Sequence, residues 1–136
     1  MVIDCITNSL EQTFTAGREI AKDLRAGDVV AFIGDLGAGK TTLIKGILSD
    51  AADVTSPTFT YLNVYLQTPM IYHFDLYRID SAQKFIAMGF EEYFEEGGIC
   101  LIEWAENIWD LLPAKASFIK ITHLDESSRK IIYEKN

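Results

Sequence analysis

The chain has few cysteines and few basic residues. Its two cysteines, Cys5 and Cys100, stand alone in apolar runs without C-x-x-C spacing, a pattern typical of reduced core residues in a cytoplasmic protein. Only 12 Lys and Arg oppose 20 Asp and Glu, which gives a net charge of −8. This balance argues against a protein that grips RNA or DNA by itself, because such proteins neutralise phosphates with positive charge.

Long hydrophobic runs are absent as well. The longest stretch without formal charge, residues 54–74, contains Pro57, Pro69 and several amide and hydroxyl side chains, which exclude a membrane span. Residues 1–9 lack the basic and then apolar pattern of a signal peptide. We therefore expect no membrane association and a cytoplasmic location. The length of 136 residues and the apolar content of 49% predict a single globular domain over residues 1–136.

The first half of the chain shows helix and strand patterns in alternation. Ser9 and Gln12 form a capping box, which predicts a helix to about residue 25 with Leu10, Phe14, Ile20 and Leu24 facing inward. The continuous apolar run 29–33 is typical of a strand buried on both faces in a parallel sheet. A glycine-rich turn follows, and then apolar residues recur at helical spacing over 40–49.

The second half predicts more strands and short helices. Residues 59–66 and 71–74 are β-rich and indicate an antiparallel hairpin. A buried strand is expected over 99–102, ending on Glu103. Further elements are helices over 81–88 and 105–112 and strands over 117–123 and 130–133.

The glycine-rich turn carries the most informative motif. Residues 34–41, Gly-Asp-Leu-Gly-Ala-Gly-Lys-Thr, match the P-loop pattern G-x-x-x-x-G-K-[ST]. The motif lies between a strand and a helix, where backbone N–H groups converge on an anion. Lys40 can then bridge β- and γ-phosphate oxygens, and the Thr41 hydroxyl can bind Mg²⁺. The sequence therefore predicts a nucleotide site with magnesium.

Two strands end in carboxylates that suit such a site, Glu103 and Asp75. Parallel strands bring their C-terminal residues to the edge where the phosphate loop lies, so Glu103 has the usual Walker B position and is expected to bind the metal or its water. Asp75 is expected in the metal's water shell or beside the attacking water. Their separate roles stay open. His73 lies on the same face as Asp75, and its role is open between a structural hydrogen bond and function.

Three classes of P-loop protein are weighed against an ATPase. No Asn-Lys-x-Asp tetrapeptide is present, so nothing specifies guanine and ATP is the expected nucleotide. A small-molecule kinase needs several arginines to clamp its acceptor, and of the four in the chain only Arg78 is expected near the site. A nucleotide-sensing interaction module, which binds ATP and scarcely hydrolyses it, remains a further alternative. The rate of ATP hydrolysis distinguishes such a module from an ATPase.

Four motifs together resemble a known family. They are residues 34–42, residues 56–59 (Ser-Pro-Thr-Phe), residues 73–78 (His-Phe-Asp-Leu-Tyr-Arg) and residues 102–106 (Ile-Glu-Trp-Ala-Glu). Their order and spacing are similar to those of the TsaE (YjeE) family, the bacterial P-loop ATPases of tRNA threonylcarbamoyladenosine formation. The resemblance implies an α/β, single-domain P-loop NTPase fold. Its sheet would be mixed, with a parallel core, an antiparallel part and helices on both faces.

The resemblance also implies roles for individual residues. Residues 56–59 would form a switch-like loop. The catalytic residues would be Lys40, Asp75 and Glu103, and Thr41 and Glu103 would hold Mg²⁺. The residues that bind ATP would be Asp35, Leu36, Gly37, Ala38, Gly39, Lys40, Thr41, Thr42, Arg78 and Trp104.

The resemblance finally implies partners. TsaD with TsaB would transfer the threonylcarbamoyl group, and ATP hydrolysis would reset the TsaB–TsaD complex between turnovers. The tRNA would be reached only through that complex, which suits an acidic chain that docks on protein. Arg78 is the only internal candidate for an arginine finger by its position in the sequence, so we expect slow hydrolysis alone and stimulation by the partners.

Overall fold

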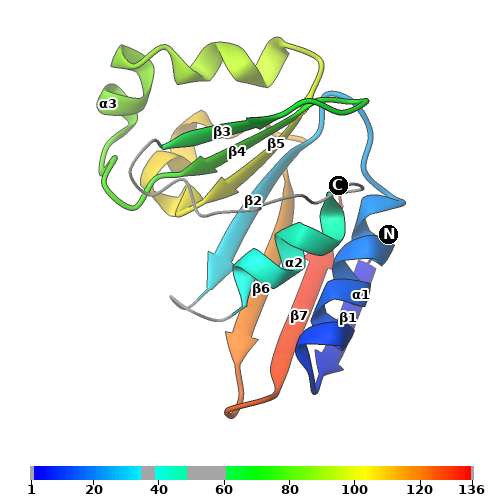
Figure 1. Cartoon of the computed structure of the whole chain (residues 1–136). Helices are drawn as coiled ribbons and strands as arrows, with labels where there is room; N and C mark the ends of the chain where they lie inside the picture. The colour runs from blue at the N-terminus through cyan, green and yellow to red at the C-terminus, as the bar shows by residue number, and fades with distance from the viewer. Residues whose placement is uncertain (1, 35–38, 49–60, 136) are drawn as a thin grey trace.

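The computed structural model describes residues 2–34, 39–48 and 61–135. These residues form a seven-stranded sheet flanked by helices (Figure 1). The strands are β1 (Val2–Thr7), β2 (Val29–Gly34), β3 (Leu62–Tyr65), β4 (Ile71–Asp75), β5 (Ile99–Glu103), β6 (Ser117–His123) and β7 (Arg129–Glu134). The helices are α1 (Leu10–Ala21), α2 (Lys40–Ile47), α3 (Ala82–Ala87) and the 3₁₀ helices η1 (Phe90–Glu95) and η2 (Ala105–Leu111). Among the described residues, no helix has the length and apolar character needed to cross a membrane.

The sheet is mixed, as the family resemblance implies. Its strand order is β1-β7-β6-β2-β5-β4-β3. The central pairs β6–β2, β2–β5 and β5–β4 are parallel, and the pairs β1–β7, β7–β6 and β3–β4 are antiparallel. The hairpin expected from residues 59–66 and 71–74 is formed by β3 and β4, and residues 59 and 60 lie outside the described ranges.

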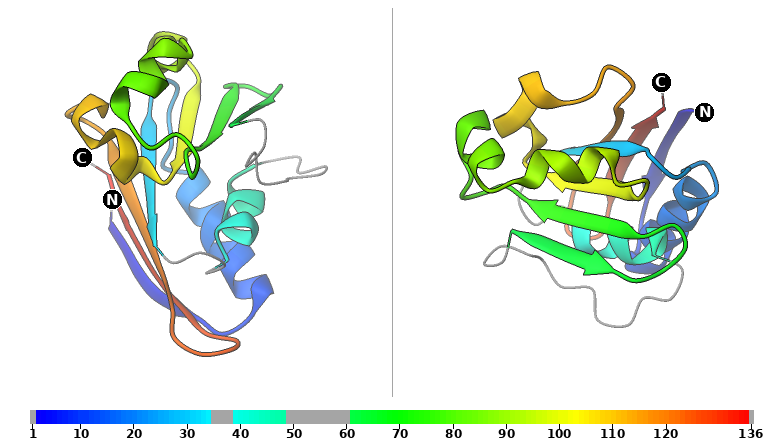
Figure 2. Two further views of the ribbon diagram at one scale, coloured as in Figure 1. Left: turned by 90° about the vertical axis from the view of Figure 1, so that its left-hand side faces the viewer. Right: turned by 90° about the horizontal axis from the view of Figure 1, so that it is seen from above.

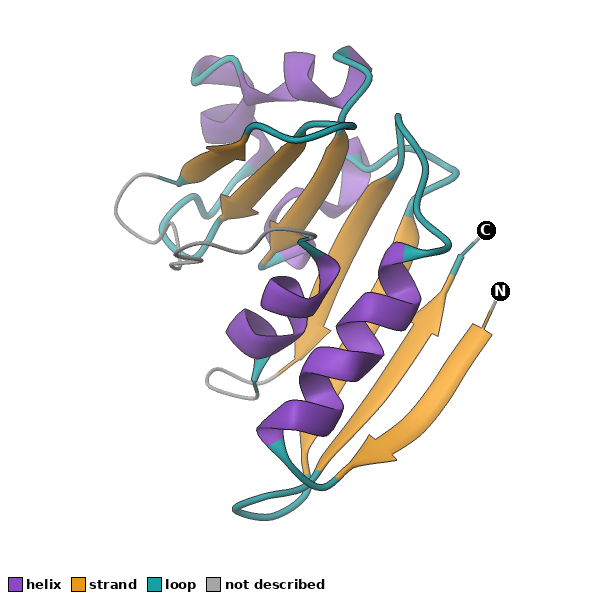
Figure 3. Cartoon of the chain, turned by 45° about the vertical axis from the view of Figure 1, so that its right-hand side comes forward, coloured by secondary structure: helices purple, strands orange, loops and turns teal. Residues whose placement is uncertain are grey.

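Helices cover both faces of the sheet (Figures 2 and 3). α1 and α2 pack on one face, whereas α3, η1 and η2 pack on the other. Successive strand residues supply opposite cores: Val30 and Phe32 of β2 lie in the core under α1 and α2, and Val29 and Ala31 lie in the other. A strand covered on both faces is apolar throughout, which explains the uninterrupted run at 29–33.

Helix α1 begins as predicted and ends at Ala21, before the predicted end near residue 25. Ile20 and Leu24 are buried as predicted. The Ser9 hydroxyl oxygen accepts a hydrogen bond from the backbone N–H of Gln12 at 3.1 Å, which confirms the cap. Leu10, expected to face inward, has 62% of its surface exposed, so that prediction is wrong. The buried stripe of α1 contains small residues such as Thr13 and Gly17, which allow a closer approach than a leucine would.

Two glycines set the distance between α1 and α2. A Cβ atom on Gly17 would lie 3.0 Å from the Cα atom of Gly46 and would overlap the carbonyl oxygen of Leu43. A Cβ atom on Gly46 would likewise overlap the carbonyl oxygen of Phe14. The two helix backbones are therefore in contact, and α1 holds α2 in position over the sheet.

Candidate functional site

The candidate site lies where α2 begins, after the C-terminal end of β2 (Figure 1). The parallel strands β2, β4 and β5 run in the same direction, so their C-terminal residues share this edge of the sheet. Gly39 is the N-cap residue of α2, and within the described residues no side-chain hydrogen bond caps the helix there. Uncapped N–H groups at a helix N-terminus form an anion site, because they carry partial positive charge and lack partners.

The backbone around the phosphate loop requires glycine at two positions. Gly34 has φ +147, and a Cβ atom there would overlap the carbonyl oxygen of Ile121 on the neighbouring strand β6. Gly39 has φ +95, a left-handed conformation that glycine adopts without strain. Both ends of the loop thus have the geometry that the motif predicts. Its middle residues, Asp35, Leu36, Gly37 and Ala38, lie outside the described residues, as does the expected switch-like segment 56–59.

Lys40 is buried, with only 6% of its surface exposed. Its Nζ atom lies 3.5 Å from the carbonyl oxygen of Gly34 and 5.4 Å from the centroid of the Trp104 ring. Burying an ammonium group costs free energy unless polar or charged partners offset the loss of water. Among the described residues, the long hydrogen bond to Gly34 and the cation–π contact with Trp104 offset only part of this cost. The surroundings of Lys40 therefore fit a phosphate group.

Trp104 has an unusual backbone conformation. It follows Glu103 directly and has φ 61, which is uncommon for a bulky residue. At the end of β5, the indole contacts the Lys40 ammonium, and its ring centroid lies 5.2 Å from that of Tyr77. The family resemblance places Trp104 beside the nucleotide or at the partner interface, and in the structure its ring contacts Lys40.

The two candidate carboxylates lie side by side. Asp75 of β4 and Glu103 of β5 are in register, and their exposed fractions are 5% and 8%. Phe32 of β2 is in register with Glu103 and lies in the core under α2, so both carboxylates point to the α2 face. Asp75 Oδ1 accepts a hydrogen bond from the backbone N–H of Tyr77 at 3.0 Å. The structure thus brings Lys40, Asp75 and Glu103 to one edge and one face of the sheet.

His73 is the partner of Glu103. Its Nε2 atom lies 2.7 Å from Glu103 Oε2, and the imidazole is almost fully buried. Its other nitrogen, Nδ1, and the hydroxyl of Tyr65 are buried without a hydrogen-bond partner in the described part of the chain. The rings of His73 and Tyr65 are stacked, with centroids 6.5 Å apart. The sequence placed His73 on the face of Asp75 but gave no sign of its bond to Glu103, which comes from the neighbouring strand.

Arg129 departs from the prediction for the arginines, whereas the place of Arg78 near the nucleotide stays a prediction. Arg78 is exposed in the turn after β4. Arg129, which the sequence did not associate with the site, packs against the phosphate loop: its Nε atom lies 2.9 Å from where a Cβ atom of Gly39 would be. The prediction that only Arg78 approaches the site is therefore wrong. The reason is topological, because β7 runs antiparallel to β6 and so begins at the edge where β2 ends.

The described residues contain no ready-made metal cage, since no three His, Cys, Asp or Glu side chains are grouped closely enough to hold an ion. Mg²⁺ is commonly bound by one or two protein ligands together with substrate phosphates and water. Thr41, exposed on the first turn of α2, and Glu103 are the candidate protein ligands. Thr42, half-buried on the same turn, is a candidate phosphate contact.

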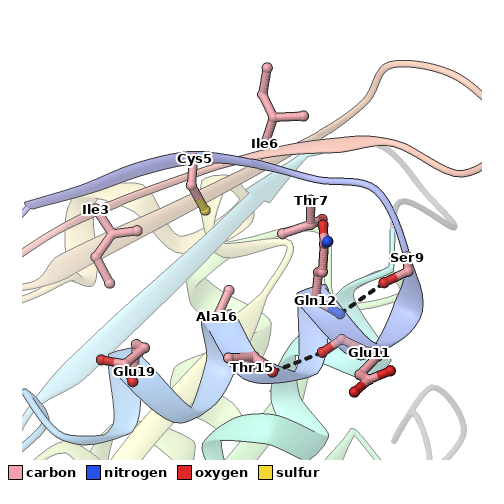
Figure 4. Close-up of a pocket in the computed structure, with 10 residues that line it drawn as sticks. All are labelled: Ile3, Cys5, Ile6, Thr7, Ser9, Glu11, Gln12, Thr15, Ala16 and Glu19. Carbon is pink, nitrogen blue, oxygen red and sulfur yellow. Dashed lines mark hydrogen bonds between the residues drawn. The ribbon is translucent and has the colours of Figure 1, made fainter.

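A separate groove lies away from this edge, between β1 and α1 (Figure 4). Its volume is about 680 Å³, and its lining combines apolar side chains with Glu11 and Glu19. Cys5 points into the groove, where burial and then the neighbouring Asp4 raise the pKa of its thiol. Among the described residues, the lining of this groove contains acidic but no basic side chains.

The fold and the site define a P-loop protein: a mixed sheet, a phosphate loop between β2 and α2, and acidic residues at the ends of β4 and β5. The family model "Threonylcarbamoyl adenosine biosynthesis protein TsaE" matches residues 7–131. The chain belongs to this family.

Individual relatives agree with the family model. The chain is 36% identical to the tRNA threonylcarbamoyladenosine biosynthesis protein TsaE of Treponema pallidum, with 93% of this chain and 96% of the relative covered. It is 37% identical to the protein of the same name from Bacillus subtilis, with 90% and 79% covered. The crystal structure of Bacillus subtilis YdiB superposes with a TM-score of 0.82 at 32% identity, over 99% of this chain and 86% of that one.

Proposed function

We propose that this chain is a Mg²⁺-dependent ATPase of tRNA threonylcarbamoyladenosine biosynthesis, acting in the cytoplasm. The observation that carries the proposal is the position of buried Lys40 at the N-terminus of α2, on the same sheet face as the carboxylates of Asp75 and Glu103. A cation and uncapped N–H groups suit the phosphates, and the carboxylates suit a metal ion and a water molecule. The names of the relatives support the pathway.

The proposed roles follow from the chemistry of each group. Lys40 and the N–H groups at the start of α2 bind the phosphates, with Thr42, Arg78 and Trp104 and with the loop residues Asp35, Leu36, Gly37, Ala38 and Gly39. Thr41 and Glu103 hold Mg²⁺, which neutralises charge on the phosphates. Asp75 orients the attacking water as a hydrogen-bond acceptor. The absence of a guanine-reading tetrapeptide from the sequence supports ATP as the nucleotide.

The proposed partner is the TsaB–TsaD complex, which hydrolysis would reset between turnovers, and tRNA would be reached only through that complex. A net charge of −8 supports docking on protein rather than direct binding of tRNA. We expect low activity of the chain alone, because a cation aimed at the γ-phosphate is worth about 10³–10⁵ in rate when a partner supplies or positions it.

The direct test is phosphate release from ATP by the purified chain, compared with Lys40→Ala and Lys45→Ala. Lys45 is the matched control because it lies on the same helix but is exposed. We expect slow release by the wild type and by Lys45→Ala, and none by Lys40→Ala. Equal release by all three proteins would contradict the proposal.

A further inference from the structure

We propose that His73 is a positioning residue for Glu103: it donates a hydrogen bond to one carboxylate oxygen and so leaves the other for the metal ion or its water. The inference rests on the proposed function, in which Glu103 binds that metal. It assigns a role to a buried side chain that takes no part in the phosphate and water contacts described above.

The geometry of this hydrogen bond suits the proposed role. His73 Nε2 and Glu103 Oε2 are 2.7 Å apart, and the side chains are 1% and 10% exposed. A carboxylate that binds a metal ion only accepts hydrogen bonds, so in the proposed role Nε2 is the donor. Nδ1 has no hydrogen-bond partner among the described residues, so the hydrogen bond to Glu103 is the one seen for this imidazole.

The imidazole is held in place by the sheet. His73 is in register with Leu101 of β5, so Glu103 is two residues further along the neighbouring strand on the same face. The stacked ring of Tyr65, inclined by 25°, lies against the imidazole from β3. Three adjacent strands thus fix the direction from which the N–H reaches Glu103.

Glu103 depends on this donor. Within the described residues, the bond from His73 is the one hydrogen bond seen to its carboxylate. When a buried carboxylate has no hydrogen-bond donor, nothing offsets the free-energy cost of its desolvation. Its side chain then rotates toward another polar group. Loss of the donor therefore moves the carboxylate and lowers metal affinity. Partners of this kind typically contribute about 10- to 100-fold to metal affinity or activity.

The test compares His73→Met with His73→Gln. The two new side chains have similar length and volume, but only glutamine has an N–H to donate to Glu103. The probe is Mn²⁺, whose binding to the protein with ADP is followed by electron paramagnetic resonance. We expect His73→Met to weaken Mn²⁺ binding at least about tenfold, and His73→Gln to stay within about threefold of the wild type. The affinity for ADP in EDTA should be unchanged in both variants.

Two further variants separate positioning from a general loss of structure. Tyr65→Phe removes the neighbouring hydroxyl and should leave Mn²⁺ binding unchanged. In a Glu103→Ala background, His73→Met should cause no additional loss, because the residue through which His73 acts is gone. Circular dichroism confirms the fold of each variant. If His73→Met does not fold, His73→Leu, which also lacks a donor, takes its place and is compared with His73→Gln in the same way.

The outcomes are distinct. Unchanged Mn²⁺ binding in folded His73→Met, or an equal loss in folded His73→Met and His73→Gln, overturns the positioning role while the proposed function stands. A wild type that binds neither ADP nor Mn²⁺ with ADP overturns both. Mn²⁺ binding that is weakened in His73→Met and close to the wild type in His73→Gln supports the positioning role of His73.

Discussion

The ammonium group of Lys40 lies over the indole of Trp104, with Nζ 5.4 Å from the ring centroid. The two residues come from the start of α2 and the end of β5, so the contact joins the phosphate loop to the strand that carries Glu103. A cation over an aromatic ring is held by about 0.5–2 kcal/mol, much less than a phosphate group offers a buried ammonium. Bound phosphate should therefore draw the ammonium away from the ring.

This relationship predicts a change in Trp104 fluorescence when Mg–ATP binds. The chain has two tryptophans, and Trp109 is 51% exposed and packs on Phe118. Trp109→Phe should keep the whole fluorescence change, and Trp104→Phe should lose it. Adding Lys40→Ala to Trp109→Phe should abolish the change. A change of equal size in Trp104→Phe would show that the ring near Lys40 does not report on the phosphate site.

The buried carboxylates should matter for turnover and little for folding. We expect Asp75→Asn and Glu103→Gln each to lower kcat at least about 100-fold, because the amides keep the shape and lose the charge. The Asn side-chain oxygen can still accept the hydrogen bond from the Tyr77 N–H. Unfolding temperatures should stay within about 3 °C of the wild type.

The matched control for the carboxylates is Glu106→Gln, an exposed acid in η2. It should keep wild-type turnover. Wild-type turnover in either Asp75→Asn or Glu103→Gln would remove that residue from the catalytic site.

The contact of α1 with α2 predicts a stability effect. Gly17→Ala and Gly46→Ala should each lower the free energy of unfolding by about 1–3 kcal/mol, because the added methyl group meets backbone atoms that cannot turn aside. Urea denaturation measures the change. Gly27→Ala is the control, since Gly27 has a positive φ but open space around it; its cost should be about 1 kcal/mol, from the backbone alone. Equal costs at all three positions would show that the helices can move apart.

The Cys100 thiol should resist chemical modification in the folded chain. Burial raises the pKa of Cys100 from 9.0 to about 12. A raised pKa leaves less thiolate at any given pH, and the thiolate is the form that reacts. Iodoacetamide at about pH 8 should therefore leave Cys100 unlabelled in the native protein and label it after unfolding in guanidinium. Rapid native labelling of Cys100 would contradict its burial.

Local sequence patterns predicted the strands and the loop that carry the candidate site residues. The order of the strands in the sheet determines which other residues contact them. The apolar run of β2, the loop motif and the acid at the end of β5 are encoded within a few residues each, so Lys40 and Glu103 could be predicted as candidates from the sequence. The bond from His73 to Glu103 depends on β4 lying beside β5. Sequence periodicity does not specify which strands are neighbours.

The wrong predictions about Arg129 and Leu10 have the same physical origin. Arg129 reaches Gly39 because β7 follows β6 antiparallel and β6 pairs with β2, a relation between distant segments. Leu10 is exposed because α1 approaches its neighbours through small residues, and a helical hydrophobic pattern favours the larger ones. Both depend on tertiary packing, which overrides the local pattern.

The most direct test of the proposed function is phosphate release from ATP by the wild-type chain with and without the TsaB–TsaD pair and tRNA, with Lys40→Ala as the blank. The proposed function predicts slow release alone and strong stimulation by the partners that disappears in Lys40→Ala. ATP binding without stimulated release would contradict the ATPase and favour a nucleotide-sensing module.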